Sequence, residues 1–209
     1  MSESSNQGNR PVYATLNKVR ELLSDRIPEE VAHNDLRPSA VLVLIYPKDS
    51  SYCVLLNKRT QIVEFNKGDI CFPGGAKDSE DADFKATALR ETEEEMGIDR
   101  KDITVIGELD ETIVPSGFFI KPFVGTIPYP YQFKPSSQEV AEVLQVPLSI
   151  LYDPGTIREE MRVFRDGRVF KTIAYGYNRH LIYGATARIL NQLLDLIGAD
   201  DNLKKVLST

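Results

Sequence analysis

Four glutamates crowd the end of one short segment, residues 83–97, of this 209-residue chain. Glu91 precedes Glu94 by three residues and Glu95 by four, so in a helix these three side chains leave neighbouring rows of one face. Glu93 points elsewhere. Like charges at this spacing cost a helix about 0.2–0.5 kcal/mol per pair, which a solvated face tolerates and a bound cation would offset. The spacing alone leaves both interpretations open.

The residues around the cluster favour a cation. Hard cations such as Mg²⁺ bind carboxylate oxygens together with water and phosphate oxygens. Gly74 and Gly75 let the backbone turn tightly and approach a ligand closely. Arg90 lies beside Glu91 and four residues before Glu94, where a forked guanidinium can hold a carboxylate in one rotamer. The combination predicts a site for metal-assisted attack on a phosphate.

The helix that must carry the glutamates has its own start and stop signals. Asp83 is a suitable N-cap, because its side chain can accept a hydrogen bond from the first helical turn. Gly97 stands where a left-handed cap is wanted. The inward-facing stripe of this helix is predicted to consist of Ala88, Leu89, Thr92 and Met96.

Apolar runs elsewhere predict strands, several of them paired as hairpins. Residues 40–46 form a continuous apolar run typical of a buried central strand, and residues 52–56 return as its partner. Asp166-Gly167 lies between two β-rich runs and indicates a second hairpin. Further strands are predicted at 103–109, 118–127 and 139–148, and amphipathic helices at 13–23 and 186–197.

Because strands and helices are interleaved, we expect an α/β (α+β) fold with a mixed sheet between helical layers. Residues 11–209 are expected to form one domain after a disordered tail of residues 1–10. The net charge of −6 provides no basic surface for nucleic acid or an anionic membrane. The sequence contains no run of about 18 apolar residues, so no membrane-spanning helix is predicted. Cys53 and Cys71 are predicted to be buried reduced thiols, which suits a cytoplasmic protein.

Residues 90–98, RETEEEMGI, resemble the second half of the Nudix box, G-x5-E-x7-R-E-U-x-E-E-x-G-U, where U is apolar. Counting forward from Gly75 places Asp81 at the first acidic position and adds one residue before Arg90. Residues 55–60, LLNKRT, and 72–75, FPGG, are similar to the pattern that precedes this longer box in the coenzyme A diphosphatases of the superfamily. Glu64 replaces an arginine of that pattern, which leaves the substrate open.

The resemblance implies a Nudix-type α/β/α sandwich and a hydrolase that cleaves a diphosphate. It implies that Glu91 and Glu95 hold Mg²⁺ or Mn²⁺, with Glu94 as a further ligand or as the catalytic base, and Arg90 as the residue that orients them. It also implies that the substrate is bound by Arg59, Gly74 and Gly75. The expected partner is a small molecule containing a nucleoside diphosphate, coenzyme A first among them, and a homodimer is compatible with the sequence.

Several alternatives remain at this stage. The substrate could be another nucleotide such as ADP-ribose or a dinucleotide, or the chain could sense a nucleotide without cleaving it. Asp81 is expected to stabilise its loop, and one of Glu139 and Glu142 could add a carboxylate to the site or lie on a solvated strand edge. His33 and His180 are expected to have surface or structural roles. Core packing is expected for three tyrosines, with stacking on an adenine as the alternative: Tyr175, Tyr177 and Tyr183.

Overall fold

The computed structural model describes residues 10–33, 35–49, 51–62, 67–163, 167 and 169–208. Glu64, Asp166 and most of the predicted tail therefore lie outside the described residues. Helix α1 (Arg10–Ser24) begins at the last residue assigned to that tail and contains the predicted helix at 13–23.

The larger sheet is mixed, as predicted. Its central strand β1 (Arg37–Lys48) pairs in parallel with β7 (Phe118–Thr126) and antiparallel with β2 (Ser51–Arg59). Neighbouring strands are hydrogen-bonded in the order β3-β2-β1-β7-β5. Three further strands, β4, β6 and β8, pair with β1, β7 and β2 respectively. The remaining strands are β3 (Ile70–Cys71), β4 (Gly74–Ala76), β5 (Thr104–Glu108), β6 (Thr112–Val114) and β8 (Val140–Pro147).

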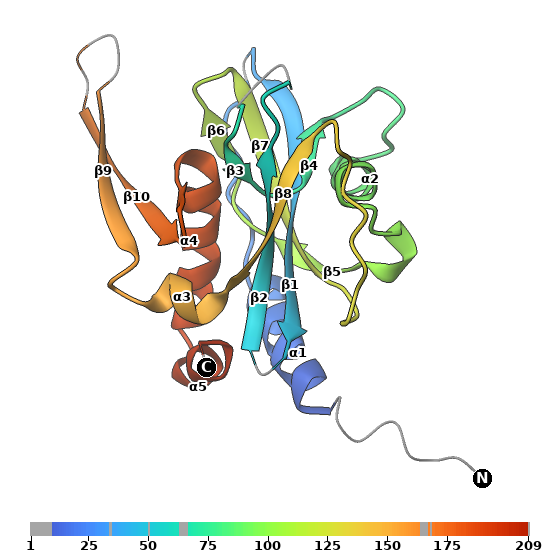
Figure 1. Ribbon diagram of the computed structural model, residues 1–209, viewed down its shortest axis with the longest axis vertical. Coiled ribbons are helices and arrows are strands. Elements are labelled where there is room, and N and C mark those ends of the chain that lie inside the picture. The colour runs from blue at the N-terminus through green and yellow to red at the C-terminus, as the bar shows by residue number, and fades with distance from the viewer. Residues whose placement is uncertain are drawn as a thin grey trace.

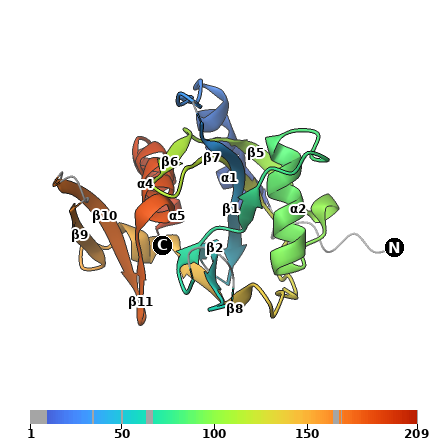
Figure 2. The same cartoon turned by 90° about the horizontal axis from the view of Figure 1, so that it is seen from above.

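Helices cover both faces of this sheet, which gives the expected α/β/α sandwich (Figures 1 and 2). Helix α2 (Phe84–Met96) and the short η1 (Arg100–Asp102) lie on one side. Helices α1, α4 (Gly184–Gly198) and α5 (Asp201–Leu207) lie on the other. Strand β1 alternates between the two cores, since Val43 and Ile45 pack on the α4 side while Leu42 and Leu44 pack on the α2 side. Burial on both faces explains its continuous apolar run.

A second, three-stranded sheet stands beside α4 (Figure 1). Strands β9 (Ile157–Val163) and β10 (Val169–Tyr177) form the predicted antiparallel hairpin, and β11 (His180–Ile182) pairs with β10. Helix α3 (Leu148–Tyr152) connects this sheet to β8. No helix in the described part of the chain is long and apolar enough to cross a membrane.

Candidate active site

The glutamate-bearing helix α2 begins and ends where its sequence predicts. The Asp83 side chain accepts a hydrogen bond from the Ala86 amide at 2.7 Å, and Gly97 adopts a left-handed conformation with φ 65°. Of the predicted stripe, Ala88, Thr92 and Met96 are fully buried against the sheet, and Leu89 is half-buried. This orientation turns the glutamate face towards the edge where β4 and the end of β2 lie.

Arg90 is the centre of one half of the site. Its Nε and Nη2 donate to the two carboxylate oxygens of Asp81 at 3.0 and 2.9 Å, while Nη1 donates to Glu91 at 2.8 Å and Glu94 at 3.0 Å. The bidentate hydrogen bond of the Arg90 guanidinium is therefore made to Asp81, and Glu94 receives a single hydrogen bond. Hydrogen bonds from Arg90, together with one from Thr87, hold the pKa of Asp81 well below its usual range against the effect of burial. Asp81 thus ties its loop to the helix, as the sequence suggests.

Glu95 is the centre of the other half, and it is almost completely buried at 1% exposure. One of its carboxylate oxygens accepts from Asn57 Nδ2 at 2.9 Å and from the Gly74 amide at 3.2 Å. The other accepts from Arg59 Nη1 at 3.2 Å. Burial raises the pKa of Glu95 to about 7, with Arg59 and the Gly74 amide opposing and the charge of Glu91 reinforcing the shift.

The two glycines lie where a side chain would collide with the site. Gly74 and Gly75 pair with Val41 and Ala40 on β1. A Cβ at Gly75 would approach the Glu91 carboxyl carbon to 2.5 Å, and one at Gly74 would approach the Ala40 carbonyl oxygen to 2.4 Å. Both positions therefore exclude a side chain, and the Glu91 carboxylate rests against Gly75, whereas the close approach of this backbone to a ligand stays a prediction.

Arg59 contacts Glu95 and also lines a cavity of about 560 Å³ on the α4 side of the sheet. Its Nε is buried and, among the described residues, has no hydrogen-bond partner, although buried polar groups are normally satisfied. Gly74, Gly75 and Cys71 also line this cavity. Cys71 is consequently not fully buried, contrary to the prediction, although burial of its sulfur raises the thiol pKa to about 12.

The donor atoms around α2 suit a hard divalent cation. Glu91, Glu94 and Glu95 supply only carboxylate oxygens. Burial raises the pKa of Glu91 and of Glu95, and repulsion from neighbouring carboxylates, Glu94 for Glu91 and Glu91 for Glu95, adds to the shift. A bound cation would relieve that repulsion. In the arrangement described, each glutamate is paired with an arginine instead, and no three carboxylate, histidine or cysteine groups of the described residues converge on one point.

The two further carboxylate candidates are placed differently. Glu142 pairs with Arg179 at 3.3 Å and His180 at 3.2 Å, on the strand edge. Glu139 is close enough for its charge to act on both Glu91 and Glu95, and its carbonyl accepts from the amide of Thr60 at 2.9 Å. Of the two candidates, Glu139 is the one near the site.

The remaining candidates have mainly structural contacts. His33 hydrogen-bonds to Glu111 at 2.7 Å and stacks on Phe119. Tyr175 is buried and donates to Asn191, while Tyr177 donates to the Gln145 carbonyl.

Two features of the site have little or no signal in the sequence. Tyr183 lines the cavity instead of packing in the core, and its hydroxyl donates to Asp69 at 2.5 Å. These partners are 114 residues apart, so their pairing follows only from the fold. Asn57 is not among the predicted site residues, yet its side-chain amide donates to Glu95 at 2.9 Å; a polar residue at the end of the apolar run of β2 is the signal that could have identified it.

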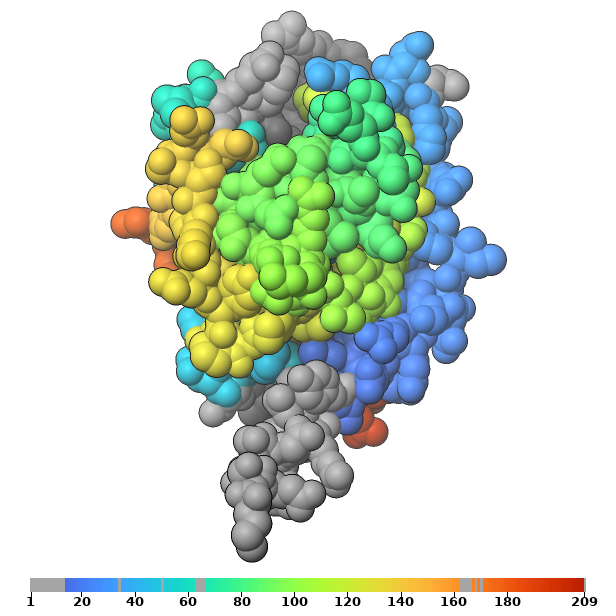
Figure 3. Space-filling view, turned by 90° about the vertical axis from the view of Figure 1, so that its right-hand side faces the viewer, coloured from blue at the N-terminus to red at the C-terminus, as the bar shows by residue number. Residues whose placement is uncertain are grey.

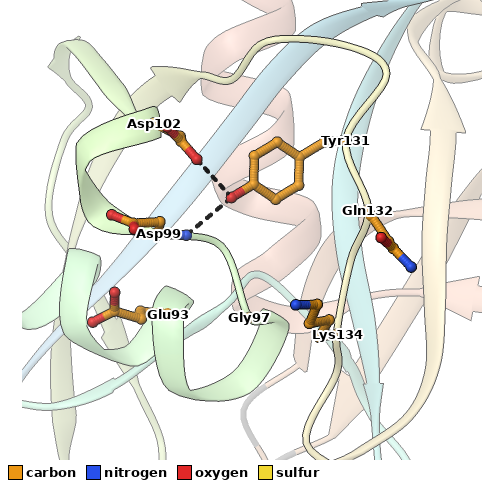
Figure 4. A pocket seen from close by; sticks show the side chains of 7 residues that line it. All are labelled: Glu93, Gly97, Asp99, Asp102, Tyr131, Gln132 and Lys134. Atoms are coloured by element: carbon orange, nitrogen blue, oxygen red, sulfur yellow. Dashed lines mark hydrogen bonds between the residues drawn. The ribbon is translucent and has the colours of Figure 1, made fainter.

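A second hollow of about 480 Å³ lies at the carboxyl end of α2, away from the paired glutamates. Figures 3 and 4 show this side, where the segment around residues 131–134 lies against the helix end. The Tyr131 hydroxyl accepts a hydrogen bond from the Asp99 amide and donates one to the Asp102 carboxylate. Glu93 lines this hollow and pairs with Arg100 at 2.6 Å, so it takes no part in the glutamate cluster.

Comparison with known proteins places the whole arrangement in one family. A family model described as NUDIX domain matches residues 36–159. The uncharacterized Nudix hydrolase NudL of Photorhabdus laumondii is 34% identical over 166 residues, covering 79% of this chain and 87% of that protein. NudL of Salmonella heidelberg is 33% identical over 178 residues, covering 85% and 91%. A MutT/nudix family protein from Enterococcus faecalis, 15% identical, shares the fold over 99% of this chain and 81% of its own, with a TM-score of 0.51. The chain is a Nudix hydrolase, a member of the superfamily that acts on diphosphate bonds and generally uses divalent metals.

Proposed function

We propose that this chain hydrolyses the diphosphate of coenzyme A or its derivatives to 4′-phosphopantetheine and adenosine 3′,5′-bisphosphate, using Mg²⁺ or Mn²⁺. The observation that carries the proposal is Arg59, which contacts the buried Glu95 with one nitrogen and lines the cavity. A diphosphate in the cavity would thus meet the glutamates at Gly74 and Gly75. The pattern of residues 55–75, similar to that of coenzyme A diphosphatases, supports the substrate.

In this proposal Glu91 and Glu95 hold the cation, and Glu94 is a further ligand or the base. A bound cation would polarise the phosphate oxygens and lower the pKa of the attacking water. Arg90 holds Glu91 and Glu94 in place and is itself anchored by Asp81. Glu94 is the most exposed of the three, at 52% of its side chain, so it can pass a proton directly to bulk water.

Arg59 binds the substrate phosphate. Its Nε lacks a partner in the described residues, and a phosphate oxygen at the cavity would provide one. Gly75 contributes by having no side chain, because a Cβ there would displace the Glu91 carboxylate. These roles agree with the assignment of Arg59, Gly74 and Gly75 to substrate binding. The proposed substrate is a small molecule. The proposed enzyme is a single domain of residues 11–209 that acts as a monomer or a homodimer.

A substrate panel tests the proposal. Purified protein with Mg²⁺ or Mn²⁺ is given coenzyme A, ADP-ribose, NADH and dinucleoside polyphosphates, and the products are separated by chromatography. Release of adenosine 3′,5′-bisphosphate from coenzyme A is the expected result. Cleavage of ADP-ribose or a dinucleotide alone would replace coenzyme A as the substrate, and tight binding without turnover would make the chain a nucleotide sensor. Glu95→Gln serves as the inactive control.

A further inference from the structure

The cavity is lined by a second arginine, Arg37, in addition to Arg59. Residues Arg37, Ser39 and Val41 alternate along β1, so their side chains leave the same face of the sheet, and all three line the cavity. Val41 lies opposite Gly74 in the register. Four residues at about 3.3 Å each place the Arg37 backbone about 13 Å along the strand from that point.

The Arg37 side chain is held at its own end of the cavity. Its guanidinium carbon lies 4.5 Å from the centroid of the Phe118 ring, and its amide donates to the Gly117 carbonyl at 2.9 Å. Among the described residues, no carboxylate forms an ion pair with it. An arginine packed on an aromatic ring keeps its forked donors oriented while leaving them available to an anion.

The wall between the two arginines is mainly apolar. Val41, Ile120 and Ile189 form part of it. Among the described residues that line the cavity, the one carboxylate is Asp69, which accepts a hydrogen bond from Tyr183. The cavity therefore offers two separate cationic side chains, which suits a ligand with two separate anionic groups.

Resting on the proposed function, we propose that Arg37 binds a second phosphate of the substrate, a phosphomonoester on the nucleoside that is separate from the diphosphate. In coenzyme A this group is the 3′-phosphate, which ADP-ribose lacks. A phosphomonoester dianion matches the forked, permanently charged guanidinium. The two ends of the cavity then have distinct tasks, since Arg59 binds the diphosphate and Arg37 selects substrates that carry the additional phosphate.

The test compares coenzyme A with 3′-dephospho-coenzyme A, which differ only in this phosphate. We expect kcat/KM to favour coenzyme A in the natural protein. Arg37→Gln should lower kcat/KM for coenzyme A about 10- to 100-fold and leave that for dephospho-coenzyme A within about twofold, the scale of one charge-assisted hydrogen bond. Arg20→Gln, a change of an exposed arginine on α1 outside the cavity, should alter neither. Equal losses on both substrates, or no loss on either, would refute the role of Arg37.

A binding measurement separates this inference from the proposed reaction. Calorimetry on metal-free protein should show tighter binding of adenosine 3′,5′-bisphosphate than of AMP, and Arg37→Gln should abolish the difference. Arg37→Lys keeps the charge but not the forked donors, so it should retain part of this difference in affinity. The lysine variant replaces the glutamine variant if Arg37→Gln has a lowered melting temperature. If coenzyme A is not cleaved at all, the proposed reaction fails, and ADP-ribose 2′-phosphate against ADP-ribose provides the equivalent pair. Equal binding of both members of every pair would overturn the inference.

Discussion

Replacing each of the two site glycines with alanine should separate the fold from the chemistry. A Cβ at Gly75 would lie 2.5 Å from the carboxyl carbon of Glu91, the free end of a side chain that can move. A Cβ at Gly74 would lie 2.4 Å from the Ala40 carbonyl oxygen and 2.6 Å from Val41 Cα, which are backbone atoms of the central strand. Gly74 also has φ 154°, a conformation that L-residues rarely adopt.

The expected magnitudes differ accordingly. For Gly74→Ala, backbone strain of about 1–3 kcal/mol adds to overpacking of about 1–3 kcal/mol, so the free energy of unfolding should fall by about 4 kcal/mol. The melting temperature should then drop by about 8–16 °C. For Gly75→Ala, the free energy of unfolding should change by less than about 1 kcal/mol, because only a partly exposed ion pair of Glu91 with Arg90 is disturbed. Displacing Glu91 by about 1 Å should nevertheless cost about 100-fold in kcat.

The assay for this pair combines thermal unfolding, calorimetric titration with Mn²⁺ and turnover of whichever substrate the panel identifies. Gly75→Ala should melt near the natural protein and bind Mn²⁺ more weakly. If Gly75→Ala instead loses as much stability as Gly74→Ala, its glycine is required by the fold. If it keeps full activity and Mn²⁺ affinity, Glu91 does not need its observed position and its assignment as a metal ligand fails.

Three other predictions concern the carboxylates. Glu95→Gln should reduce activity more than about 100-fold while the melting temperature changes little, since a neutral isostere avoids burying a charge; unfolding of this variant would mean that Glu95 is structural. The pKa of Glu95 is raised from 4.5 to about 7, so the folded state favours the protonated carboxyl. The contribution of this group to the free energy of unfolding of the metal-free protein should be up to about 3 kcal/mol below pH 4.5 and should be lost as the pH rises through 7. Chemical denaturation at pH 5 and 7.5 should show this loss in the natural protein but not in Glu95→Gln, and a loss shared by both would assign it to other groups. Asp81→Ala should destabilise the fold by about 2 kcal/mol and lower kcat, because Arg90 loses its forked partner; circular dichroism melts and turnover check both, and an unchanged kcat would separate Asp81 from the site.

The features that the sequence predicted well are local. Asp83 and Gly97 cap α2 through hydrogen bonds between residues three or four apart, so neighbouring sequence suffices to identify them. The same holds for the two hairpins, whose partners are adjacent in the chain. It did not extend to the second sheet, because the hairpin signal predicts that β9 pairs with β10 without showing that they lie apart from the larger sheet, and β11 was not predicted.

The sequence by itself determined the family, the helix that carries the glutamates and the inventory of groups at the site. Only the tertiary structure decided which of those groups meet. Glu95 is held by Asn57, Arg59 and Gly74, which are 38, 36 and 21 residues away, and Arg37 shares a cavity with Arg59 only because both strands face α4. Contacts of this range depend on strand order and register, which are set by the simultaneous packing of both faces of the sheet and not by any one segment.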